Sequence, residues 1–188
     1  MTSFFNNSEL SSLQFKSIGN KVNISRLASF YDIRNISIGN NVRIDDFCIL
    51  SGNITLGNNI HIAAGTYLFG GNAGIILKDF SNLSSRIAIY AESDDYSGIT
   101  LTNPTIPNIY KNLTKKLVVI NKHVIIGTGS VILPGVDIGE GVAIGALSLV
   151  NKSLPPWKIC VGIPAVPVKE RKKDLLKLEE QYNKYSAP

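Results

Sequence analysis

The 188-residue chain has few charged side chains, two histidines, two cysteines and no long apolar run. Charged residues make up 18% and apolar residues 44%, so the chain can bury a core and lacks the composition of a disordered protein. No stretch approaches the roughly eighteen apolar residues of a membrane-spanning helix, and MTSFFNNSEL has neither the basic start nor the apolar run of a secretory signal. We therefore expect one soluble, cytoplasmic domain without stable membrane insertion.

The cysteines and the net charge of +5 point away from two further classes of protein. Cys48 and Cys160 are far apart, lie beside aliphatic residues and form no CxxC pair, which predicts buried, reduced thiols. The basic excess is concentrated in KERKKDLLKLEEQYNK, where acidic residues interleave with it. This distribution predicts a local anion site and no nucleic-acid binding, which requires a basic face with base-reading or stacking side chains.

An aliphatic residue recurs every six positions along most of the chain. A helix needs spacings of three and four, and an alternating strand needs a period of two, so neither accounts for the pattern. Period six describes short flat strands joined by tight corners, and three such faces close one triangular coil that must stack on its neighbours. Ordinary short strands in a sandwich would not keep so many positions in phase: Ile38, Ile44, Leu50, Leu56, Ile62, Leu68, Leu77, Leu83, Ile89, Ile120, Ile126, Ile132, Ile138, Ile144 and Val150.

The hexads ISIGNN, ITLGNN and VIIGTGSVILPGVDIGEGVAIGALSLV, followed by GIPAVPVKER, resemble the hexapeptide-repeat acyltransferases, specifically the galactoside and maltose O-acetyltransferase group. The resemblance implies an all-β fold, the left-handed parallel β-helix, with acetyl-CoA as co-substrate, no metal, and a homotrimer with interfacial active sites. We expect an N-terminal cap over residues 1–20, the β-helix over 21–167 and a C-terminal helix over 168–188. In the N-terminal segment, Asn7 or Ser8 is expected to be the N-cap of a short helix.

The repeat breaks after YAESDDYSG and resumes at Ile120. Residues 95–117 are therefore expected to form a non-repeating loop, and a loop of that length inside a compact domain usually has a function. The resemblance implies that this loop reaches from one subunit toward the next, beside the active site.

The resemblance also places a set of residues along the CoA molecule. Small residues let the thin pantetheine arm approach the backbone, and basic residues meet its phosphates. For the glycine and alanine of the set, the plainer alternative is that they are corner residues of the repeat. The set comprises Gly127, Thr128, Ala146, Asn151, Lys152, Lys169 and Arg171.

The catalytic position departs from that group. Its members keep a histidine, the general base, at the last position before the loop, and this chain has Asp94 there. We expect His61 to act as the base, with Asp94 or Asp95 holding the imidazolium, and His123 is the second candidate. Either histidine can instead be an ordinary corner residue.

The sequence thus predicts an acetyl-CoA-dependent O-acetyltransferase that acts directly on a sugar hydroxyl, in surface polysaccharide or glycan biosynthesis. The alternative is an N-acetyltransferase on an amino-sugar nucleotide, because an amine needs less help from a base. A non-catalytic structural β-solenoid is a further alternative. A zinc hydratase of the γ-carbonic anhydrase kind shares the prism but needs three imidazole ligands, and the chain has two histidines.

Overall fold

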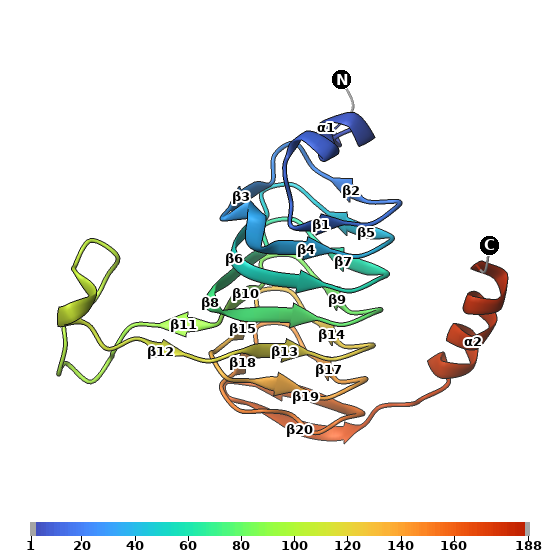
Figure 1. The fold of residues 1–188 in the computed structure, drawn as a ribbon. Helices are drawn as coiled ribbons and strands as arrows, with labels where there is room; N and C mark the ends of the chain where they lie inside the picture. Colours follow the sequence, from blue (N-terminus) through green and yellow to red (C-terminus); the bar gives the residue numbers. More distant parts are fainter. Residues whose placement is uncertain (1–2, 187–188) are drawn as a thin grey trace.

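The computed structural model describes residues 3–186 and shows a triangular prism of stacked coils, a left-handed parallel β-helix (Figure 1). The predicted fold class is confirmed. Strands β6 and β8 each turn a corner and contribute to two faces of the prism. The first sheet contains β1 (Ser17–Ile18), β4 (Ile36–Ile38), β6 (Ile49–Leu56), β8 (Tyr67–Leu77), β10 (Ala88–Tyr90), β15 (Val131–Ile132) and β18 (Leu149–Val150), with β3 (Ser29–Tyr31), β13 (Val118–Ile120) and β16 (Asp137–Ile138) attached to it.

The second sheet forms the remaining face. All its pairs are parallel except the last. Its strands are β2 (Asn23–Ile24), β5 (Val42–Ile44), β7 (Ile60–Ile62), β9 (Asn82–Leu83), β14 (Ile125–Ile126), β17 (Ala143–Ile144), β19 (Lys158–Gly162) and β20 (Ala165–Glu170). Within residues 3–186, no helix is long and apolar enough to cross a membrane.

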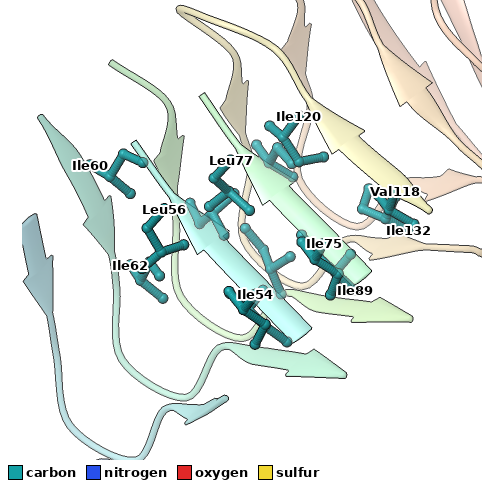
Figure 2. Packing of buried hydrophobic residues seen from close by; sticks show 14 of the residues in the cluster. Ile54, Leu56, Ile60, Ile62, Ile75, Leu77, Ile89, Val118, Ile120 and Ile132 are labelled. Carbon is teal, nitrogen blue, oxygen red and sulfur yellow. The ribbon is translucent and has the colours of Figure 1, made fainter. Parts of the chain in front are cut away.

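The period-six residues form the core of the prism. Parallel pairing stacks each one directly on its counterpart in the next coil, as Ile44 on Ile62 and Ile62 on Leu83, and all three are fully buried. Figure 2 shows the same inward stacking between neighbouring coils for Leu56, Leu77 and Ile120. Each such side chain contributes about 1.5–3 kcal/mol by leaving water, so the repeat supplies most of the driving force for folding. Cys48 and Cys160 are also buried and free, as predicted.

In the GNN corners, the asparagine and glycine residues have different structural roles. Asn41 and Asn59 adopt the left-handed conformation, with φ of 54° and 57°. The preceding glycines are needed for space instead, because a Cβ at Gly39 would lie 2.4 Å from the carbonyl oxygen of Gly57. Asparagine side chains then join successive coils: Asn58 Oδ1 accepts the backbone N–H of Asn40 at 2.8 Å.

Gly39→Ala is expected to lower the free energy of unfolding by about 1–3 kcal/mol, because the added methyl group has no room against the next coil. Denaturant unfolding measures the change. Ser37→Ala, at an outward position of the same coil, is the control and should stay within about 0.5 kcal/mol of the wild type. Equal stabilities of the two variants would show that the close approach of the coils is not a constraint.

Both ends differ in detail from the expected boundaries. Helix α1 (Asn7–Ser12) is capped by Asn6, whose side chain accepts the N–H of Glu9, so neither Asn7 nor Ser8 is the cap. Helix α2 (Leu175–Ser186) begins later than residue 168. The reason is that β20 runs antiparallel to β19 as far as Glu170 and closes the last coil.

The break in the repeat is an arm that projects from one edge of the prism (Figure 1). Strands β11 (Glu92–Ser93) and β12 (Thr114–Lys115) pair antiparallel at its base. Its outer part contains the single-turn helix η2 (Asn108–Tyr110), and a similar turn, η1 (Ile33–Asn35), lies in an early coil. The expected loop 95–117 thus contains the returning strand β12.

Candidate functional site

The base of the arm forms a small pocket around Asp94. Asp94 Oδ1 accepts the backbone N–H of Asn103 at 3.3 Å, and Lys111 Nζ donates to the carbonyl oxygen of Asn103 at 3.0 Å. Among the residues described, nothing donates to the other carboxylate oxygen of Asp94. The cavity has a volume of about 180 Å³ and also includes Ser93 and Pro104 in its wall. A half-buried carboxylate with one free oxygen is suited to hold a cationic or N–H-bearing group.

Asp95 has a different role from the one expected for it. Its carboxylate accepts the N–H of Ser97 at 2.8 Å and both the N–H and the hydroxyl of Thr100, at 3.2 and 3.0 Å. Hydrogen bonds from Ser97, and then from Thr100, lower the pKa of Asp95 to about 2. Asp95 therefore shapes the first turn of the arm, and its carboxylate does not face an imidazole within the chain.

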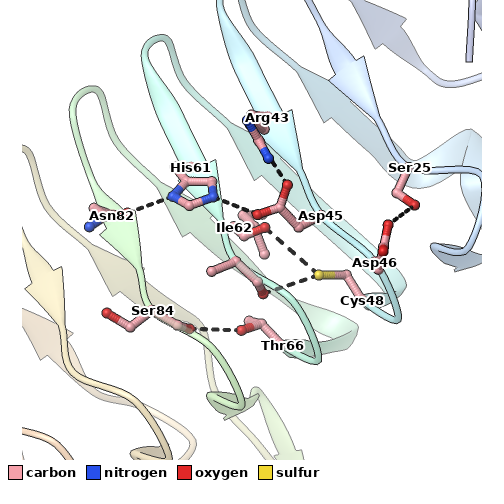
Figure 3. Close-up of polar contacts among 11 residues, drawn as sticks. Ser25, Arg43, Asp45, Asp46, Cys48, His61, Ile62, Thr66, Asn82 and Ser84 are labelled. Carbon is pink, nitrogen blue, oxygen red and sulfur yellow. Dashed lines mark hydrogen bonds and ion pairs between the residues drawn. The ribbon is translucent and has the colours of Figure 1, made fainter. Parts of the chain in front are cut away.

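His61 lies on the outer face of β7 and has another acidic partner than expected. Its Nε2 is 2.8 Å from Asp45 Oδ2, and its Nδ1 is 3.2 Å from Asn82 Oδ1 (Figure 3). Arg43 donates to the other oxygen of Asp45 at 2.7 Å. Burial alone would raise the pKa of Asp45, but hydrogen bonds from His61 and Arg43 hold that pKa below its ordinary value. Both ring nitrogens of His61 thus have partners within the chain, and these are Asp45 and Asn82 instead of the expected Asp94 or Asp95.

His123 is a structural residue of the corner that meets α2. It is only 7% exposed, its ring stacks on Phe80 at 5.2 Å, and its Nε2 is 2.8 Å from Glu179 Oε2. Lys122 Nζ lies 2.5 Å from the second oxygen of Glu179. These contacts hold α2 against the prism, and they engage Nε2 of His123 at that corner.

The structure brings three of the predicted CoA residues together. Gly127, Thr128 and Ala146 share one corner on successive coils, and a Cβ at Gly127 would lie 2.4 Å from the backbone nitrogen of Ala146. Thr128 Oγ1 donates to the carbonyl oxygen of Ser85 at 2.6 Å. The corner is therefore a nearly smooth ridge of backbone and small side chains. The same observation fits plain corner residues.

The other four predicted CoA residues lie apart from that corner. Asn151 and Lys152 are exposed at the corner after β18, and Lys169 is exposed on β20. Arg171 is partly buried, and its guanidinium donates to the carbonyl oxygens of His123 and Gly141 at 2.8 and 3.0 Å. Arg171 thus fastens the segment before α2 to the prism, a role that the sequence reasoning missed.

The described residues include neither an activated cysteine nucleophile nor a cluster of metal ligands. Burial raises the pKa of Cys48 to about 11, so its thiol is inert at neutral pH. Among residues 3–186 there is no group of three or more His, Cys, Asp or Glu that could hold a metal ion.

A prism of hexads with an arm at its edge defines the class of protein, and comparisons with known proteins agree. The family described as bacterial transferase hexapeptide (six repeats) matches residues 35–70. A dTDP-4-amino-4,6-dideoxy-D-glucose acyltransferase of Escherichia coli is 48% identical over 177 residues, covering 93% of this chain and 92% of that protein. The chain belongs to the hexapeptide-repeat transferases and is an enzyme of the acyltransferase class.

Solved structures of AntD, an N-acyltransferase from Bacillus cereus, are similarly close. One, in complex with dTDP-4-amino-4,6-dideoxyglucose and coenzyme A, has 52% identity and a TM-score of 0.96, covering 98% of this chain and 99% of that one. Another holds dTDP and 3-hydroxybutyryl-CoA, at 53% identity with the same TM-score, covering 98% of each chain. Other AntD structures carry S84A or D94N substitutions, and this chain has Ser84 and Asp94 at those numbers.

A galactoside O-acetyltransferase of Lactococcus lactis, from the group expected first, is 32% identical over 58% of this chain and 52% of that protein. The comparisons therefore favour the amino-sugar alternative over transfer to a sugar hydroxyl.

Proposed function

We propose that the protein transfers an acyl group from acyl-CoA to the 4-amino group of dTDP-4-amino-4,6-dideoxyglucose. The observation that carries this proposal is the similarity along almost the whole chain to two acyltransferases that are described with this acceptor. The arm pocket supports it, because a carboxylate at Asp94 suits an amino group better than a hydroxyl. A cytoplasmic location, expected from the sequence, is part of the proposal.

The proposed reaction is direct. The ammonium form of the acceptor first gives one proton to solvent, and Asp94 then orients the neutral amine by accepting an N–H through its free oxygen. The nitrogen attacks the thioester carbonyl carbon and the carbon–sulfur bond breaks. The excess proton on the nitrogen passes to the departing sulfur, so the products are the amide and the CoA thiol. An unprotonated amine is already a good nucleophile, so the reaction needs no imidazole base. The backbone N–H groups at the corner of Gly127 and Thr128 are the candidates for stabilising the oxyanion.

We propose that CoA lies along the ridge of Gly127, Thr128 and Ala146, with Asn151, Lys152 and Lys169 toward its phosphates. The ridge precedes β15, whereas the arm follows β10, so the two lie at opposite edges of one face of the prism. A site that contains both is completed by a neighbouring copy. This arrangement supports the homotrimer expected from the sequence.

The function is tested by CoA-thiol release with two acceptors, dTDP-4-amino-4,6-dideoxyglucose and dTDP-glucose, which offers a hydroxyl at the same carbon. We expect turnover with the amine and no more than about 1% of that kcat/KM with the hydroxyl, because an unpaired polar contact at a polar site costs a hundredfold or more. Acetyl-CoA and 3-hydroxybutyryl-CoA are compared as donors. Faster transfer to the hydroxyl would restore the O-acetyltransferase hypothesis, and no CoA-dependent thermal shift would favour a structural solenoid.

His61→Gln is expected to change kcat/KM less than tenfold, whereas removal of a general base costs about 10²–10⁴-fold. Glutamine keeps hydrogen-bonding capacity next to Asp45 and Asn82, so the fold should persist. The same assay gives the result, with Asn82→Ala as the control for loss of a partner in the cluster. A loss of two or more orders of magnitude in His61→Gln alone would make the imidazole the base after all.

A further inference from the structure

Two aromatic side chains face outward on the face of the prism from which the arm leaves. Phe69 on β8 and Tyr90 on β10 are in register, and their rings stack at 5.2 Å between centroids with an interplanar angle of 23°. The residues before them, Leu68 and Ile89, point inward and are fully buried. Tyr67 adds a third ring, 6.2 Å from Phe69, and is 37% exposed. The ring pair of Phe69 and Tyr90 therefore lies outside the core.

Tyr90 of the ring pair is close along the chain to the pocket around Asp94. Tyr90 is the last residue of β10, and the backbone continues through β11 to Asp94. At about 3.3 Å per residue of extended chain, Asp94 lies within about 13 Å of Tyr90. A ring surface and a carboxylate are thus four residues apart along the backbone, with a bend at Ala91 between them.

A cation lies beside this segment. The backbone N–H of Lys116 donates to the carbonyl oxygen of Ala91 at 2.9 Å, which places the backbone of Lys116 beside the residue that follows Tyr90. Its aliphatic stem packs on Gly135, where an added Cβ would meet Lys116 Cδ at 2.9 Å. Within the described part of the chain, no carboxylate pairs with the ammonium group of Lys116. The aromatic ring, the cation and the carboxylate are arranged in this order. A nucleotide-linked amino sugar has its base, diphosphate and amino group in the matching order.

We propose that the ring pair of Phe69 and Tyr90 is the platform for the pyrimidine base of the acceptor nucleotide, with Lys116 directed at the diphosphate and Asp94 at the sugar amine. The inference rests on the proposed function for the identity of that nucleotide. Any nucleobase stacks on an aromatic side chain, because every base has a π face. The adenine of CoA is the other base available, and the direct connection of the rings to Asp94 assigns the platform to the acceptor.

The test is isothermal titration of the full chain with dTDP and, separately, with CoA. Phe69→Leu and Tyr90→Leu keep apolar volume but remove a ring, and each should weaken dTDP about tenfold, within the range for one base stacked on an aromatic side chain. Tyr90→Phe keeps the ring and should bind dTDP as the wild type does. Tyr31→Leu is the matched control: Tyr31 is an exposed ring two strands away on the same face. CoA binding should be unchanged in all four variants.

The binding data would overturn the inference in any of three ways: unchanged dTDP affinity in both leucine variants, a loss of CoA affinity instead, or loss of dTDP binding in Tyr90→Phe. A change in the mass of the assembly on light scattering would likewise overturn it, since the rings would then be a subunit contact. Failure of the proposed function gives another signature. If dTDP binding depends on the rings but no acyl group reaches the amino sugar, the proposed function is wrong and the platform stands. If the acyl group is transferred but dTDP binding does not depend on the rings, the platform is wrong and the proposed function stands.

Discussion

Asp94→Asn should lower kcat/KM for dTDP-4-amino-4,6-dideoxyglucose by about 10²-fold or more, the scale of losing a group that positions a reacting atom. Asparagine still accepts the N–H of Asn103, so the pocket keeps its shape. What disappears is the negative charge that holds and orients the amine. Thiol release at varied acceptor concentration gives the value, and the thermal shift with CoA should be unchanged.

Asp95→Asn is the matched control for this prediction. It removes the neighbouring charge from the same arm, but that carboxylate is already used by Ser97 and Thr100. We expect kcat/KM to stay close to that of the wild type and the arm to become more sensitive to protease. Equal losses in the two variants would mean that the arm, and not the carboxylate of Asp94, is what the reaction needs.

Ala146→Tyr is expected to weaken CoA binding by at least about 100-fold, because a large side chain on the ridge occupies the line proposed for the pantetheine arm. Ala146 is exposed, so the substitution should leave the prism folded. Ala146→Gly keeps the ridge small and should retain CoA affinity. The two dissociation constants are compared by calorimetry, and dTDP binding serves as the internal reference. If the tyrosine variant binds CoA normally, the donor lies elsewhere.

The prism could be predicted because its cause is local and periodic. Because the aliphatic residues recur every six positions and three faces make one coil, each coil places Ile44 in register with Ile62 of the next. This stacking of the coils determines the core. The break at the arm was visible for the same reason, and with it the position of Asp94. The ends were less predictable, because β20 reverses direction through pairing with β19.

The roles of the histidines could not be read from residue type. His61 was expected to act as a base because imidazole titrates near neutral pH. Its partner Asp45 belongs to the preceding coil, so the contact exists only once β5 and β7 are aligned side by side. His123 depends on Glu179, fifty-six residues later, through a helix whose docking no repeat predicts. Coil stacking determines the first contact and helix docking the second, and neither follows from spacing along the chain.

The engagement of both imidazoles has a consequence for the pH dependence of catalysis. Asp45 and Asn82 enclose one ring, and Glu179 and Phe80 enclose the other. In the proposed reaction, the acceptor's own amino group therefore manages its proton at neutral pH. The rate at subsaturating acceptor should follow the deprotonated fraction of the substrate's own amino group, so a substrate with a less basic amine would shift the profile while the protein stays the same.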